Sequence, residues 1–213
     1  MLVEQRKIYL LDVILTFLPI LLALCVVWYA PETIVSRFDH EGNVVATASR
    51  WTILILPILI LLFSGLMKWI DDKELVGSKN KEVSRYIFRL TLLLFNAIAY
   101  FQFVLILTGV SVGTQKVRFL AFLMGLFMIF IGNVSPMIKE TNKHFGFRVP
   151  WIMNKDEAFR KTQRFFGFAS MISGIIFILI SLFVGNKLAM VLVSIGLLLT
   201  IGITAVYSYK ISK

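Results

Sequence analysis

Six runs of apolar residues, each roughly 20 residues long, limit what this chain can fold into. They cover residues 8–29, 51–70, 87–110, 119–138, 165–184 and 188–207. A helix of about 20 residues rises about 30 Å, which is the thickness of the hydrocarbon core of a bilayer. Because lipid offers no hydrogen-bond partners, the backbone inside it must bond to itself, and isolated apolar runs do so as helices. The sequence therefore predicts an all-α, polytopic integral membrane protein with six transmembrane helices.

The distribution of basic residues predicts how these helices cross the membrane. With the N-terminus in the cytoplasm, 17 of the 22 Lys and Arg lie on the cytoplasmic side, and five lie outside. Loops on the cytoplasmic side of membrane proteins carry such an excess of Lys and Arg. We therefore expect both termini in the cytoplasm, with the chain as a multi-pass protein of the cell membrane.

The net charge of +10 requires no nucleic acid as a partner. Cations along the inner surface are attracted to anionic lipids, which we expect as partners. A docking surface for an acidic protein is the alternative explanation. The single cysteine, Cys25, makes no internal disulfide and is interpreted as a small apolar residue among helices.

The loops between the runs suggest two domains and no soluble one. Residues 1–86 form an N-terminal two-helix membrane segment with an outer loop at 30–50, and residues 87–213 form a four-helix membrane domain with a cytoplasmic loop at 139–164. Asp39, His40 and Glu41 in the outer loop resemble a set of cation ligands. Three adjacent residues cannot all point at one centre from a strand or helix, so we predict no metal site and no cofactor.

The cytoplasmic loop 139–164 carries more ordered features than a simple connection needs. Pro136 is expected to kink or end the fourth helix because it lacks an N–H, and Gly146 permits a bend. Pro150 holds Val149 extended, and Trp151 is suited to the level of the lipid headgroups. The loop is therefore predicted to end one span, anchor at the interface and start the next span.

Two further features of this loop concern charge and helix capping. Arg148 is suited to bind either a lipid phosphate or a carbonyl or carboxylate inside the bundle, and the sequence leaves both options open. Asn154 is predicted as the N-cap of the fifth helix, with Glu157 three residues later to reach back to it. The fifth helix is thus expected to begin near Lys155.

The ordered residues of the loop resemble one family of bacterial membrane proteins. The residues that carry the resemblance are Gly132, Asn133, Pro136, Lys139, Asn142, Gly146, Arg148, Pro150, Trp151, Thr162, Arg164 and Gly167. Their long, mixed spacing resembles the SdpI-like family, the membrane immunity proteins for the sporulation-delaying killing peptide. The N-terminal part is similar to the domain that commonly precedes this motif, with Arg37 where that domain has a histidine before Phe38.

The resemblance implies a protein that protects its cell from a membrane-active peptide toxin. Some members also act as receptors that hold a cytoplasmic repressor at the membrane, so a repressor is a second implied partner. The motif residues other than the glycines at 132 and 167 are the candidates for a site that responds to toxin or partner. We hypothesise that toxin enters from outside and contacts the outer loop, with Arg37, Phe38 and His40 as candidates.

Two other classes of function compete with immunity. A transporter exporting a hydrophobic peptide or lipid would use polar residues inside the spans, such as Asn96, Gln102 and Asn133. Interhelical hydrogen bonding is the simpler explanation of these residues. An enzyme is disfavoured because the sequence lacks a zinc-protease motif, and His40 and His144 are predicted on opposite sides of the membrane. We therefore predict no catalytic residues.

Overall fold

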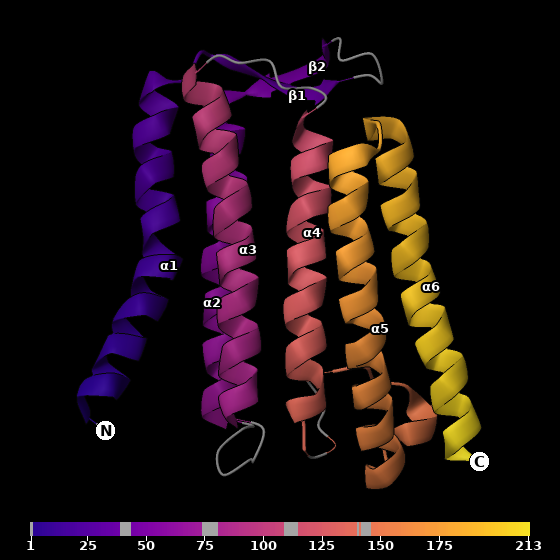
Figure 1. Cartoon of the computed structure of the whole chain (residues 1–213). Helices are drawn as coiled ribbons and strands as arrows, with labels where there is room; N and C mark the ends of the chain where they lie inside the picture. The colour runs from indigo at the N-terminus through magenta and orange to yellow at the C-terminus, as the bar shows by residue number, and fades with distance from the viewer. Residues whose placement is uncertain (1, 39–43, 74–80, 109–114, 140, 142–145) are drawn as a thin grey trace. The chain divides into compact units, whose positions relative to one another are not determined.

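The computed structural model describes residues 2–38, 44–73, 81–108, 115–139, 141 and 146–213. In that part of the chain, six helices are long and apolar enough to cross a membrane. The six helices are α1 (Leu2–Tyr29), α2 (Ile55–Lys73), α3 (Lys81–Thr108), α4 (Gln115–Val134), α5 (Asp156–Phe183) and α6 (Asn186–Ser212) (Figure 1). This confirms the predicted class, a multi-pass helical membrane protein. The predicted orientation of the termini stays a prediction.

The chain folds as two compact units. One comprises Met1–Lys73 with Phe88–Thr114, and the other comprises Glu74–Ile87 with Gln115–Lys213. The first unit thus holds α1, α2 and most of α3, and the second holds α4, α5 and α6. The predicted boundary between an N-terminal segment 1–86 and a domain 87–213 stays a prediction.

The first unit has two small apolar cores along α1. One gathers Ala23, Val26 and Val27 of α1 with Ile53 and with Ala99 of α3. The other joins one buried residue from each of α1, α2 and α3, namely Leu15, Ile60 and Leu92. Small side chains at such contacts let helices approach closely, which is how helices pack in lipid.

A β-hairpin, which the sequence analysis did not predict, joins α1 to α2. Strand β1 (Thr33–Phe38) pairs antiparallel with β2 (Val44–Ser49), and a short 3-10 helix, η1 (Arg50–Leu54), leads into α2. The register is irregular around Ser36, whose hydroxyl donates to the carbonyl of Ala46 at 3.1 Å. Ile34 is buried and fastens the hairpin to the core at this end of the helices.

In the second unit, α4 and α5 cross at two pairs of glycines. A Cβ on Gly132 would lie 2.6 Å from the carbonyl oxygen of Gly167, and a Cβ on Gly125 would lie 2.7 Å from that of Gly174. The glycines are seven residues apart on each helix, so one glycine pair lies two turns from the other along the contact. The antiparallel helices are therefore in backbone contact at both levels.

Polar and aromatic contacts hold α6 against α5. The hydroxyls of Ser173 and Thr200 lie 2.6 Å apart, and a Cβ on Gly196 would lie 2.5 Å from the ring of Phe177. Phe165 of α5 stacks on Tyr207 of α6 with their ring centroids 4.1 Å apart. The stacked rings of Phe165 and Tyr207 place the start of α5 beside the end of α6 (Figure 1).

Candidate functional site

The α4–α5 connection, residues 135–155, is fastened to α5 by one buried glutamine. The Oε1 of Gln163 accepts hydrogen bonds from the Ser135 hydroxyl and from the Phe147 N–H, both at 3.0 Å. Its Nε2 donates to the Phe147 carbonyl at 2.8 Å. Gln163 is fully buried, and its amide therefore substitutes for a backbone partner of Phe147. Ser135 and Phe147 of the connection are thus held to α5.

Gly146 makes this arrangement possible. Its φ is +86°, a conformation that residues with a Cβ rarely adopt, and a Cβ there would lie 2.5 Å from the Gln163 Oε1. Buried Ile138 would also be 2.9 Å from that Cβ. Both the backbone angle and the available space therefore require glycine, which confirms the predicted bend.

The later part of the connection is tied to the last turns of α6. The Trp151 indole N–H donates to the Ser208 hydroxyl at 2.9 Å, and its ring meets Tyr209 edge-on. The Lys155 ammonium donates to the carbonyl of Ser212. The connection is thus held by α5 at Phe147 and by α6 at Trp151 and Lys155.

Proline and glycine residues shape the connection as the sequence predicts. α4 ends at Val134, and Pro136 lies in the 3-10 helix η2 (Ser135–Met137) that follows. Val149 is extended, with φ −135° and ψ 146°, before Pro150 opens the 3-10 helix η3 (Pro150–Ile152). These positions confirm the predicted end of the fourth helix and the predicted effect of Pro150.

The start of α5 differs from the prediction in its capping residue. The N-cap is Lys155 rather than Asn154, and no side chain caps the helix. Glu157 instead forms an ion pair with Lys161 at 2.7 Å, and Asp156 accepts a hydrogen bond from Thr141 at 2.7 Å. The capping box fails because the 3-10 helix η3 sets the chain direction, and the Lys155 N–H donates to the carbonyl of Ile152.

The structure separates the predicted site residues into exposed and buried ones. Thr162 is buried, and its hydroxyl donates to the Ala158 carbonyl within α5. The exposed motif residues are Asn133, Pro136, Lys139, Gly146, Arg148, Pro150, Trp151 and Arg164. Arg37 is exposed in β1, which also contains Phe38. Asn142 and His40 lie outside the described residues.

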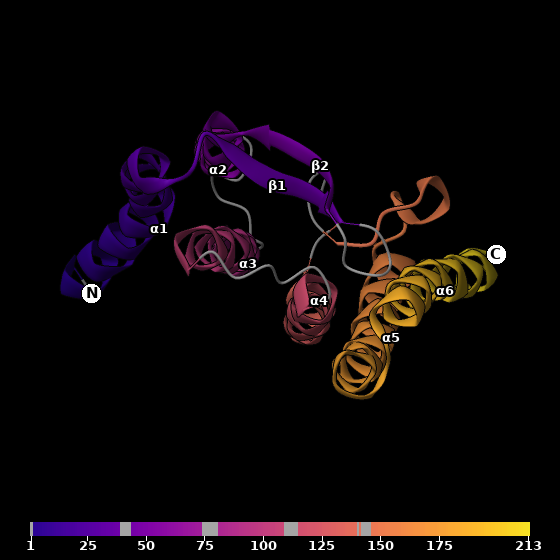
Figure 2. The same cartoon turned by 90° about the horizontal axis from the view of Figure 1, so that it is seen from above.

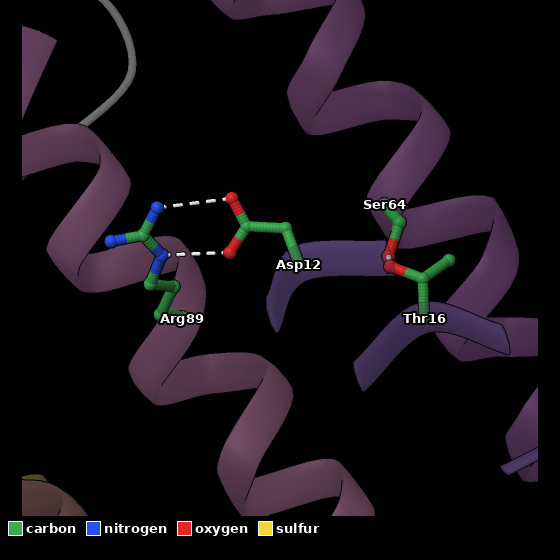
Figure 3. A network of polar contacts seen from close by, with 4 residues as sticks. All are labelled: Asp12, Thr16, Ser64 and Arg89. Carbon is green, nitrogen blue, oxygen red and sulfur yellow. Dashed lines mark hydrogen bonds and ion pairs between the residues drawn. The ribbon is translucent and has the colours of Figure 1, made fainter. Parts of the chain in front are cut away.

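A second polar cluster lies inside the first unit (Figure 3). Arg89 of α3 donates two hydrogen bonds to the Asp12 carboxylate of α1, at 2.7 and 3.0 Å. About one turn further along α1, the Thr16 hydroxyl donates to Ser64 of α2 at 3.0 Å. Asn96 of α3 donates to the Leu15 carbonyl at 2.9 Å. Asn96 thus makes an interhelical hydrogen bond, which is the explanation of this residue that competes with a transport pathway.

Neither the role of Gln163 nor the Asp12–Arg89 pair was predicted from the sequence. Gln163 stands between Thr162 and Arg164, two residues of the motif, in the polar stretch that begins α5, and only its complete burial in the fold distinguishes it from its neighbours. Asp12 and Arg89 are 77 residues apart, and no local pattern connects them. Among the described residues, no group of three or more His, Cys, Asp and Glu is placed to hold a metal ion.

Replacing Gln163 by leucine is expected to release the α4–α5 connection. The Phe147 N–H and carbonyl would lose their partner, and each unsatisfied buried group costs about 1–3 kcal/mol. Hydrogen exchange of residues 146–153 should therefore become faster than in the unaltered protein. Gln102→Leu in α3 is the matched control, and equal exchange rates in the two variants would contradict the role of Gln163.

The apolar helices and the hydrogen-bonded connection between α4 and α5 define the structural class of this protein. The chain is a multi-pass helical membrane protein whose most ordered polar structure lies at the junction of α4, α5 and α6. The described residues of this junction bring together hydrogen-bonded side chains and exposed arginines.

Comparison with known proteins specifies the class further. Residues 139–208, which contain most of this junction, match the SdpI/YfhL protein family. The chain is also 24% identical over 208 residues to the immunity protein SdpI of Bacillus subtilis (strain 168), covering 93% of this chain and 94% of that protein. No solved structure matches the chain. The predicted resemblance to the SdpI-like family is confirmed, and the chain is a distant relative of that immunity protein.

Proposed function

We propose that this protein gives its cell immunity to a membrane-active peptide toxin. The observation that carries the proposal is the similarity to an immunity protein along nearly the whole chain, at 24% identity. The matched family segment 139–208 coincides with the junction held by Gln163, Trp151 and Lys155. The protein acts by binding toxin rather than by catalysis, and it needs no cofactor.

Toxin is bound from outside, and the α4–α5 connection responds on the cytoplasmic side. A ligand shifts a conformational equilibrium only if it binds one state more tightly than the other. The described part of the connection is held to α5 and α6 by a few hydrogen bonds and by the buried side chains of Ile138 and Ile152, and toxin binding acts by loosening these hydrogen bonds. When the hydrogen bonds of Phe147 or Trp151 break, the protein surface that is exposed to the cytoplasm changes.

Arg148 and Arg164 are the residues that a cytoplasmic repressor or anionic lipids contact. Both side chains are exposed, and both belong to the family motif. Exposed guanidinium groups bind carboxylates and phosphates through two parallel hydrogen bonds. The motif residues Thr162 and Pro150 serve instead to shape the junction.

Replacing Arg148 by alanine tests the functional role of the junction. Because the side chain is exposed, we expect membrane abundance to stay unchanged while protection of a toxin-sensitive strain falls. Survivors after exposure to the sporulation-delaying peptide are counted at matched protein levels. Arg118→Ala, an exposed arginine at the start of α4, is the control. Full protection by Arg148→Ala would contradict a role of Arg148 in function.

Direct binding of toxin has its own test. Detergent-solubilised membranes that contain the tagged protein are exposed to toxin carrying a photo-cross-linker. We expect a covalent adduct that excess unlabelled toxin suppresses. Failure to cross-link or co-purify from cells that are nevertheless protected would exclude the direct-binding form of the proposal.

A further inference from the structure

Among the residues that the structure describes, no strand pairs with the outer backbone edge of β2 in the hairpin β1–β2. The Arg50 N–H donates to the Glu32 carbonyl at 3.0 Å, which fixes the alternation of the ladder. Bonded and non-bonded pairs alternate in antiparallel sheets, so the facing pair Val35 and Thr47 is a non-bonded one. The N–H and carbonyl of Thr47 therefore point away from β1, along the outer edge of β2.

Nothing in the composition of β2 blocks this edge. Strand β2 reads VVATAS, without charge and without proline, whereas natural edge strands use lysine, proline or inward charges to prevent pairing. Val44 and Val45 are 52% and 59% exposed. Seen from above, β1 lies between β2 and α3, so the β2 edge faces away from α3 (Figure 2). The edge is therefore suited to accept a further strand.

Aromatic residues place this edge at the membrane surface. Trp28, Tyr29 and Trp51 flank the hairpin and are 76%, 83% and 55% exposed. Exposed Trp and Tyr at the ends of membrane helices lie at the level of the lipid headgroups. Amphipathic peptides partition into the same layer. A membrane-active peptide bound in the headgroup layer therefore lies at the same depth in the membrane as the β2 edge.

We propose that the β2 edge, centred on Thr47, binds an extended segment of the peptide toxin as a third strand. The segment is apolar and uncharged, because β2 offers backbone hydrogen bonds and valine side chains but no charge to pair with. This is strand addition, in which main-chain hydrogen bonds provide affinity and side-chain contacts provide specificity. The proposal rests on the proposed immunity function and assigns its toxin-binding surface.

Thr47→Pro removes the outward N–H while the inward hydrogen bonds of the ladder remain. With the full-length protein in lipid nanodiscs and fluorescent sporulation-delaying peptide as the probe, we expect affinity to fall about tenfold or more. Thr47→Lys, which places a charge on the edge, should cause a similar loss with the backbone intact. Thr47→Val and Val35→Pro, on the opposite edge, are controls that should bind as the unaltered protein does. Unchanged binding by both Thr47→Pro and Thr47→Lys would overturn the proposal.

Survival assays separate this proposal from the proposed function. If the unaltered protein protects cells and Thr47→Lys protects them equally at equal abundance, the edge is not the toxin site although immunity stands. If the unaltered protein does not protect, the immunity function itself fails. A disulfide-linked dimer of Val45→Cys in a Cys25→Ala background, formed without peptide and unaffected by it, would show that a second copy occupies the edge, and it would also overturn the proposal.

Discussion

Replacing Gly132 by alanine is expected to force α4 and α5 apart and to remove most of the folded protein from the membrane. The added Cβ would lie 2.6 Å from the backbone oxygen of Gly167, and a backbone atom cannot turn aside as a flexible side chain can. Overpacking of this kind costs about 3 kcal/mol. For a chain of this size, that cost lowers the melting temperature by roughly 10 °C. Thermal unfolding of the detergent-purified protein measures the change.

Two glycines elsewhere in the helices provide controls for this substitution. A Cβ on Gly65 of α2 or on Gly202 of α6 would meet nothing within 4 Å. Because alanine is the better helix former, Gly65→Ala and Gly202→Ala should leave the melting temperature unchanged or raise it slightly. A loss of stability common to all three variants would contradict a specific contact between α4 and α5.

Asp12→Ala is expected to destabilise the first unit strongly. It removes a carboxylate that accepts two hydrogen bonds from Arg89, and the two side chains are only 25% and 16% exposed. Removing one partner of a buried ion pair costs about 3–5 kcal/mol, because the remaining charge stays in an apolar environment. Thermal unfolding should show a lower midpoint than that of the unaltered protein.

A double variant distinguishes the ion pair from general damage. Asp12→Ala combined with Arg89→Leu should recover most of the lost stability, because apolar replacements of both partners leave no buried charge. Glu157→Ala, which removes one partner of an exposed ion pair with Lys161, should leave the midpoint unchanged. A double variant that is less stable than Asp12→Ala alone would contradict the explanation that the unpaired buried charge of Arg89 causes the loss of stability.

The sequence predicted the membrane helices well because the bilayer imposes a simple rule on them. Each apolar run became one long helix, and Pro136, Gly146 and Pro150 had the predicted local effects. The hairpin was missed because strands of six residues around a turn carry too short an alternation to stand out beside long apolar runs. Local rules therefore located the helices and the bends but not this small sheet.

The candidate site was only partly predictable, because its contacts join distant residues. The motif marked the segment that the junction occupies, yet Gln163, which holds it, was overlooked beside the charged motif residues. Trp151 contacts Ser208, 57 residues away, and no local pattern in the sequence connects two residues so far apart. The seven-residue spacing of glycines on α4 and α5 was visible in the sequence, but only the fold shows that they face each other.

Survival of a toxin-sensitive strain tests the central claim most directly. Cells that lack their own immunity gene express either the unaltered protein or an empty vector, and survivors are counted after exposure to the sporulation-delaying peptide. The proposed function predicts many more survivors with the protein than with the vector, and a loss of that protection with Gly132→Ala, which lowers the amount of folded protein in the membrane. Equal killing of both strains, at verified levels of the unaltered protein in the membrane, would contradict immunity to this toxin.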